Sequence, residues 1–430
     1  MVRTRVAALA GVLALAAGLT VGLGAATTAS AAATLTNAAT SAGLQNFAAN
    51  VETLGETRFP DTFAGAALTS AGVVIVYSTN TSDAALNSAM AKLNTGNYPV
   101  GYIAARFSYS KLDALNSALA AVQAKLHKDG VELFMSEPDA ATGAVDVTLL
   151  RPTSADFARL NSSGVISPAP GRLTTANYSR AVSAVISSIA GSGYAVEPAW
   201  QAQPATTTTP NSPDSPAGRY NGTAPFNGGD YIKGTNRLNC TGGFSVEGNK
   251  SHNPFMLTAG HCGRTTWSTP AQAMGRTSSL YWRNPARDDF QTIRVGSARG
   301  NVNGNTDAYA VVGQVVPARD SLLTLDGSVT GEVHDIKVLS NNATIYNIKG
   351  PGGVKFTASH LVTAAGPCTG GDSGGPMYVR VPAPLQVRAV GTIVAYYGLP
   401  SGGFACAGER IGYELSASNT SLILDARVVR

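Results

Sequence analysis

The stretch CTGGDSGGP, residues 368–376, decides how the rest of this 430-residue sequence is interpreted. Glycines flank Ser373 on both sides, and Asp372 directly precedes it. A backbone so rich in glycine can form a tight turn that presents a hydroxyl and convergent backbone N–H groups to one substrate atom. Acyl transfer requires that combination. Taken alone, however, a serine in such a turn is explained equally well as a structural residue of the turn as by a catalytic role.

A second motif supplies a base for this serine. The segment LTAGHC, residues 257–262, contains His261 beside Cys262. An imidazole accepts and returns a proton near neutral pH, so His261 is the expected general base and then general acid. The adjoining cysteine would anchor it through a disulfide. The two motifs together, in this order, are very hard to obtain by chance.

Together these motifs resemble the histidine and serine motifs of the chymotrypsin family, in its bacterial streptogrisin-like and α-lytic-protease-like branch. The resemblance covers residues of about 226–425 and includes Asn227-Gly228-Gly229-Asp230, which is similar to the start of mature enzymes in that branch. It implies an all-β catalytic domain of two six-stranded antiparallel β-barrels. His261 and its aspartate would lie in the first barrel and Ser373 in the second, with the substrate cleft between them.

Two aspartates compete to orient His261, namely Asp289 and Asp307. The resembled branch has its aspartate just before an aromatic residue and a strand that often carries an arginine. Asp289 fits that frame, since Phe290 follows it and it lies 28 residues after His261. Gln291-Thr292 departs from the small or apolar residues usual there. We therefore expect a triad of His261, Asp289 and Ser373 and keep Asp307 as the alternative.

The resemblance also assigns the residues around Ser373. The backbone N–H groups of Gly371 and Ser373 would form the oxyanion hole, and Asp372 would be a structural carboxylate. The pocket walls would come from residues 363–367 and 391–397, whose side chains are uncharged. A serine is typical near Val394, and its absence leaves the substrate preference open.

All four cysteines lie in the second half of the chain. An even count in an exported protein favours disulfides over a metal site, and four cysteines allow three pairings. The resemblance implies the pairs Cys240–Cys262 and Cys368–Cys406. No metal or other cofactor is expected.

Composition separates the two halves. Residues 220–430 carry 18 Lys and Arg against 13 Asp and Glu, whereas residues 1–219 are balanced. The basic residues are scattered singly, which argues against nucleic-acid binding. After residue 220, short apolar runs alternate with Gly, Asn and Pro turns, an all-β pattern. Examples are the runs 255–258, 292–295, 345–348 and 389–395.

The first half is divided by its composition. Residues 1–31 have the layout of a secretory signal peptide: Arg3 and Arg5, an alanine-rich apolar stretch, and Ala29-Ser30-Ala31 as a cleavage site. Residues 32–200 mix helical periodicity, as in 82–93 and 111–128, with strand-like runs, which predicts a small α/β domain.

Residues 201–219 are rich in Thr, Pro and Ser and are expected to form an exposed linker open to proteolysis, before the catalytic domain of 220–430.

These observations predict a secreted, extracellular serine endopeptidase that is made as an inactive precursor. Its partners would be protein or peptide substrates and its own propeptide, residues 32–200, as in the resembled branch. Nucleic acid and a stable membrane anchor are not expected, and the enzyme would be a monomer. The alternative is a protease-like protein that binds without efficient cleavage. An esterase of unrelated fold is disfavoured, because that class places its serine before its histidine.

Overall fold

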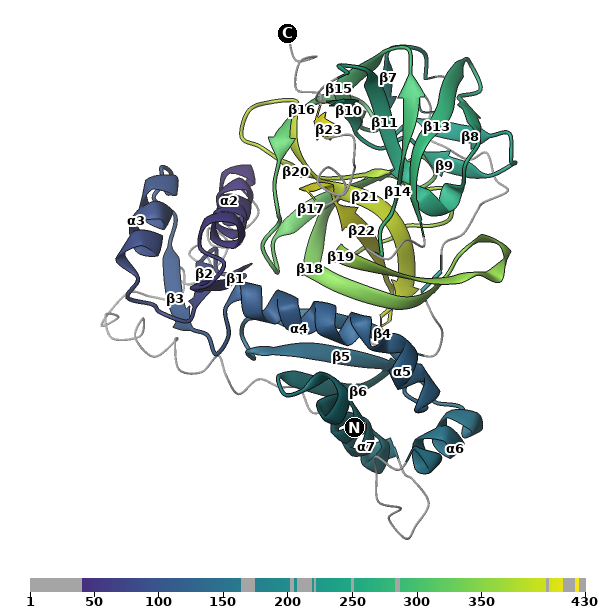
Figure 1. Ribbon diagram of the computed structural model, residues 1–430. Coiled ribbons are helices and arrows are strands. Elements are labelled where there is room, and N and C mark those ends of the chain that lie inside the picture. Colours follow the sequence, from purple (N-terminus) through teal and green to yellow (C-terminus); the bar gives the residue numbers. More distant parts are fainter. Residues whose placement is uncertain are drawn as a thin grey trace, which may run out of the picture.

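The computed structural model describes residues 41–163, 175–201, 205–206, 219, 222–248, 251–282, 287–399, 402–412 and 422–424. The proposed signal segment lies outside these ranges. Figure 1 shows helices packed on small sheets in the N-terminal part, in purple to teal, and strand-rich barrels in the C-terminal part, in green to yellow. The predicted fold class, a β-rich part preceded by an α/β part, is confirmed.

The α/β part consists of two units with the same order of elements. In each, two antiparallel strands are followed by a third strand that runs parallel to the second. The first unit comprises α2 (Ala42–Arg58), β1 (Phe63–Leu68), β2 (Val74–Ser78), α3 (Ala84–Leu93) and β3 (Val100–Ala104). The second comprises α4 (Tyr109–Ala121), α5 (Gln123–Lys128), β4 (Leu133–Asp139), β5 (Ala144–Leu150), α6 (Ser154–Ser162), α7 (Thr175–Ala190) and β6 (Tyr194–Gln201).

The helical pattern predicted for residues 111–128 is present but is divided. Leu112, Leu119 and Leu126 are fully buried on one face, as their spacing requires. At Val122 the backbone leaves helical geometry, with φ −97° and ψ 6°, and α4 ends there. The helical segment predicted for residues 111–128 is therefore divided into two short helices, α4 and α5.

The first barrel closes through one bent segment, residues 239–248. This segment pairs with β8 (Tyr231–Gly234) through β9 (Asn239–Thr241), and with β11 (Pro254–Ala259) through β10 (Ser245–Gly248). Backbone hydrogen bonds of Gly243 and Phe244 with Leu257 bridge the two stretches. The ring continues through β14 (Asp289–Val295), β13 (Ala273–Trp282) and β12 (Thr266–Ser268), which pairs with β8.

The second barrel is a closed ring of six antiparallel strands. Around the ring these are β17 (Leu322–Gly327), β20 (Pro376–Arg380), β21 (Gln386–Gly398), β22 (Phe404–Arg410), β19 (Lys355–Ala365) and β18 (Gly331–Lys349). Strands β15 (Ala298–Asn303) and β16 (Ala308–Gln314) connect the barrels, with β7 (Phe226–Gly228) beside β15 and β23 (Leu422–Leu424) beside β10. The four runs named above for the second half of the chain fall in β11, β14, β18 and β21.

The second α/β unit continues the sheet of the second barrel. Strand β4 pairs antiparallel with β18, so that Ser136 lies opposite Thr344 and Met135 opposite Ile345. Asn116 of α4 reaches across and donates from Nδ2 to the carbonyl oxygen of Asn342, at 3.0 Å. In Figure 1, α4 accordingly lies alongside the long β18–β19 hairpin. The α/β part is thus joined to the β-rich part by backbone pairing.

None of the helices in the described ranges is long and apolar enough to cross a bilayer.

Candidate active site

His261 is held at the end of β11, where the chain turns into the short 3₁₀ turn Gly260–Cys262. The disulfide Cys240–Cys262 fastens the residue that follows it, and its imidazole is almost completely buried. Glycine is required at position 260, because a Cβ there would lie 2.9 Å from the carbonyl oxygen of Tyr281 and 3.0 Å from Oδ1 of Asp289. The turn therefore brings His261 directly against the start of β14.

Asp289 is the first residue of β14 and is fully buried. Its Oδ1 accepts from the backbone N–H of His261 at 2.7 Å, and its Oδ2 lies 2.7 Å from Nδ1 of the imidazole. Burial raises the pKa of this carboxyl, and the hydrogen bonds from His261 act in the opposite direction. Asp307, the alternative, is exposed before β16 and bonds with the hydroxyl of Thr306.

Ser373 completes a continuous chain of hydrogen bonds. Its Oγ lies 2.8 Å from Nε2 of His261, across the boundary between the two barrels. The structure thus brings together the three residues predicted from the sequence, and Asp289 rather than Asp307 is the aspartate that contacts the histidine.

Gln291 and Thr292, the departures from the resembled pattern, have structural partners. Gln291 donates from Nε2 to the carbonyl oxygen of Ala259 at 2.9 Å and accepts from Oγ1 of Thr277 at 2.8 Å. Thr292 accepts from the backbone N–H of Ser279 at 3.0 Å. Both side chains are buried, and these bonds compensate their burial. They leave the catalytic geometry undisturbed.

The loop around Ser373 is fixed by Asp372. Its Oδ1 accepts from the backbone N–H groups of Val329 and Thr330, each at 3.0 Å, and its Oδ2 accepts from that of Thr369 at 2.8 Å. Gly371, at φ 97°, adopts a conformation that favours glycine. Burial raises the pKa of Asp372, whereas these hydrogen bonds lower it. The carboxylate therefore acts on the shape of the loop.

The second disulfide joins Cys368, ahead of the serine loop, to Cys406 of β22. Both pairings are those that the resemblance implied. Within the described ranges, no three His, Cys, Asp or Glu side chains gather as a metal site would require.

A segment of the linker lies beside this site. The backbone N–H of Thr206 donates to the carbonyl oxygen of Tyr396 at 3.0 Å, and the N–H of Tyr396 donates back at 3.2 Å. The N–H of Lys349 donates to the carbonyl oxygen of Ala205, which is fully buried. The prediction of an exposed linker is wrong for these residues, because their backbone groups find partners on β18 and β21. Strand β21 pairs with β20, the strand that follows the serine loop, and its Ile393 exchanges backbone hydrogen bonds with Gly374 and Gly375 of that loop.

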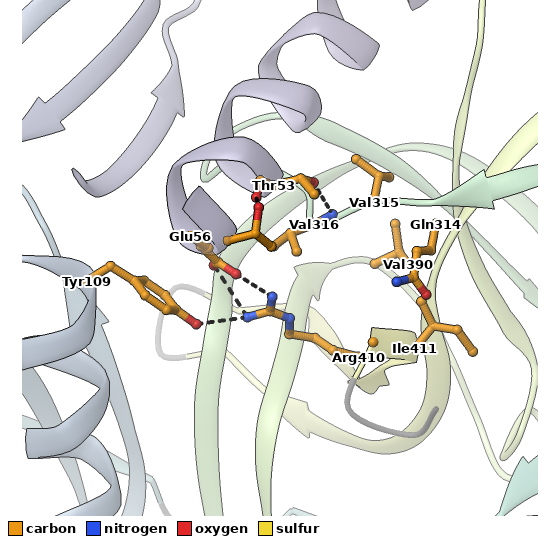
Figure 2. A pocket seen from close by; sticks show the side chains of 11 residues that line it. Thr53, Glu56, Tyr109, Gln314, Val315, Val316, Val390, Arg410 and Ile411 are labelled. Atoms are coloured by element: carbon orange, nitrogen blue, oxygen red, sulfur yellow. Dashed lines mark hydrogen bonds and ion pairs between the residues drawn. The ribbon is translucent and has the colours of Figure 1, made fainter. Parts of the chain in front are cut away.

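A cavity of about 330 Å³ lies between α2 and the second barrel. Figure 2 shows Glu56 of α2 and Tyr109 converging on Arg410 of the barrel. Arg410 donates from Nη2 to Oε2 of Glu56 at 2.5 Å and from Nη1 to the Tyr109 hydroxyl at 3.3 Å. No local pattern in the sequence indicates this buried ion pair, since its members are more than 300 residues apart.

Comparison with known proteins places similarity only in part of the chain. No protein-family model and no curated protein matches it. Similar solved structures include Protease A of Thermobifida fusca (27% identity, TM-score 0.36), chymotrypsin of Cellulomonas bogoriensis (24%, 0.37) and a Nocardiopsis protease (24%, 0.36). In the same order, the matched regions span 44%, 46% and 46% of this chain and 94%, 98% and 97% of the three matched chains. The predicted resemblance to bacterial chymotrypsin-like proteases is confirmed, while the roles of individual residues rest on the geometry described above.

Proposed function

We propose that this chain is the precursor of a secreted serine endopeptidase. The observation that carries the proposal is the buried chain of hydrogen bonds from Asp289 through His261 to Ser373, with distances of 2.7 and 2.8 Å. A hydroxyl bonded to an imidazole that is itself oriented by a carboxylate is an activated nucleophile.

In the proposed reaction, Ser373 Oγ attacks the peptide carbonyl carbon while Nε2 of His261 takes its proton. The carbonyl oxygen becomes an oxyanion, which the N–H groups of Gly371 and Ser373 would bind. His261 then gives its proton to the leaving amine, and the acyl group stays on Ser373. Water, deprotonated by His261, releases the acid product and regenerates the hydroxyl. Asp289 stays ionised and stabilises the imidazolium.

We further propose that residues 32–200 act as a propeptide that inhibits the enzyme. Support comes from the two-way backbone bonding of Thr206 with Tyr396, which is the antiparallel pairing expected of a bound peptide substrate. The bridge between Thr206 and Tyr396 is antiparallel, and a substrate bound to β21 in this register would place the residue two positions after the one at Tyr396 opposite Val394. Val394 follows Ile393, which is bonded to Gly374 and Gly375. We therefore expect self-cleavage at or next to residue 208.

The test is covalent labelling by an active-site-directed phosphonyl fluoride. The processed enzyme should be labelled at Ser373 and should hydrolyse a mixed peptide library. His261→Ala should abolish both, whereas His252→Ala, a surface histidine with its own partner in Glu247, should preserve both. A processed, disulfide-intact protein that takes no label would instead be a binding protein of protease-like fold. Mass spectrometry of the secreted form locates the cleavage site.

A further inference from the structure

Arg219 stands between the linker pairing at Thr206 and the first strand of the barrels, and its side chain is only 2% exposed. Its Nη1 forms an ion pair with the carboxylate of Asp326 and donates to the carbonyl oxygen of Gly327 at 3.3 Å. Its Nη2 donates to Oδ1 of Asn305 at 3.3 Å. Arginine is rarely buried unless it is paired, so these contacts fix Arg219 to the second barrel.

Asp326 and Gly327 end β17, and a turn of residues 328–330 follows them; we call residues 326–330, which contact the serine loop, the support turn. Its N–H groups at Val329 and Thr330 bind the carboxylate of Asp372. A Cβ placed on Gly327 would lie 2.1 Å from Oδ1 of Asp372, so this carboxylate rests directly on the turn. The neighbour of the nucleophile is therefore held by the residues that directly follow Asp326.

The support turn also touches the serine loop on the other side of Ser373. A Cβ on Gly375 would lie 2.6 Å from the carbonyl oxygen of Asp326. The N–H of Ser328 donates to Oγ1 of Thr241 at 3.0 Å, and this hydroxyl donates to the carbonyl oxygen of Gly371 at 2.6 Å. A displacement of the turn would therefore move the loop at both ends of the proposed oxyanion hole.

Arg219 supplies the positive charge that this arrangement needs. Asp326 is fully buried, and the negative charges of Asp372 and Glu332 add to burial in raising its pKa. The guanidinium of Arg219 acts in the opposite direction. Without it, an ionised Asp326 would be a buried charge beside two other carboxylates, which is strongly unfavourable.

We propose that Arg219 is a positioning residue for the serine loop: the segment N-terminal to the barrels holds the support turn in the geometry that acyl transfer requires. The inference rests on the proposed peptidase function. It also places the mature N-terminus upstream of Arg219, whereas the resemblance of Asn227–Asp230 to a mature start would place it downstream.

The test compares Arg219→Met, Asp326→Asn and the double variant, each expressed as the full precursor and then processed. Arg219→Met should lower kcat by about tenfold or more with little change in KM, because an oxyanion interaction acts in the transition state. The double variant removes both charges and should recover most of kcat. The matched control is Lys337→Met, which removes an exposed pair with Asp320 in the same barrel and should leave kcat unchanged.

The pH profile separates positioning from a general loss of stability. Burial raises the pKa of Asp326 to about 8 even beside Arg219, so in Arg219→Met kcat should fall further as pH rises above about 8 and ionises the unpaired carboxyl, and this fall should be absent from the wild type and from the double variant. If the single variant does not fold, an active double variant still supports the proposal. An unaffected Arg219→Met, a double variant as impaired as the single one, or an active mature enzyme that begins after residue 219 overturns it. A wild type that neither cleaves nor labels contradicts the proposed function itself.

Discussion

Thr206 and Tyr396 exchange both of their backbone hydrogen bonds, so a residue from the linker occupies the edge of strand β21 beside the triad. The triad is already assembled while this residue is bound, with 2.8 Å between His261 and Ser373. The proposed inhibition of the precursor therefore requires no distortion of Asp289, His261 or Ser373.

The backbone pairing of Thr206 with Tyr396 predicts how a proline at position 206 affects self-processing. Thr206→Pro removes the N–H that donates to Tyr396, and one hydrogen bond is worth about 1 kcal/mol, or several-fold in binding. Self-processing of the secreted precursor should slow by about fivefold or more when followed by mass spectrometry. Thr206→Ala keeps the backbone and should be processed at the wild-type rate. Equal rates for the proline variant would mean that the pairing plays no part in cleavage.

The two competing aspartates give a second prediction. Asp289→Asn should reduce kcat on a peptide substrate by about 10⁴, because an amide no longer fixes the reactive tautomer of His261. Folding should be unaffected, since the hydrogen bond from the His261 backbone to the side-chain oxygen can persist. Asp307→Asn, on an exposed turn, should retain full activity. Comparable losses in both variants would contradict the assignment of Asp289.

The sequence could predict His261 and Ser373 of the hydrogen-bonded triad because a local motif surrounds each of them. The contact of Asp289 with His261 depends on strand register, because β14 pairs with β11 so that Phe290 lies opposite Ala259. That register puts Asp289 against the turn that carries His261. No local pattern specifies such a pairing between segments about 30 residues apart.

Long-range pairing also explains what the sequence did not reveal. The joining of β4 to β18 and the burial of Arg219 against Asp326 each link segments over 100 residues apart. The polar composition of the linker predicted exposure, which is wrong for the described residues Ala205 and Thr206. Their backbone groups bind a sheet edge, which side-chain composition does not encode.

Gln291 provides a prediction about stability. Gln291→Leu would leave the buried carbonyl oxygen of Ala259 without this donor, which should lower the free energy of unfolding by about 1–3 kcal/mol. Urea unfolding of the phosphonylated enzyme measures this without self-digestion. Arg294→Gln, at an exposed position of the same strand, should change it by less than about 0.5 kcal/mol. A leucine variant as stable as the wild type would show that the bond contributes nothing.

The contact between α2 and the second barrel predicts how inhibition depends on pH. Burial raises the pKa of Glu52 and of Glu56 above the ordinary value of 4.5, and the charge of Glu56 adds to the rise at Glu52. The pKa of Glu52 is lowered by the N–H of Ala66 within the first α/β unit and by Asn341 and Arg410 on the barrel side. Arg410 also lowers the pKa of Glu56, whereas the charge of Asp113 raises it further. The net effect of the contact is that both carboxyls bind protons more tightly in the complex.

When the processed propeptide separates, these carboxyls regain water and their ordinary pKa values. The complex therefore holds more protons than the separated parts at pH values between 4.5 and the raised pKa values, and a rise in pH through that window favours separation. Peptidase activity released on dilution of the processed complex should accordingly increase from pH 4.5 towards neutrality. Glu52→Gln, which stays neutral at every pH, should flatten this increase, whereas Asp61→Asn in the same unit should preserve it. Inhibition that strengthens as pH rises would show that the Glu56–Arg410 ion pair outweighs burial at this contact.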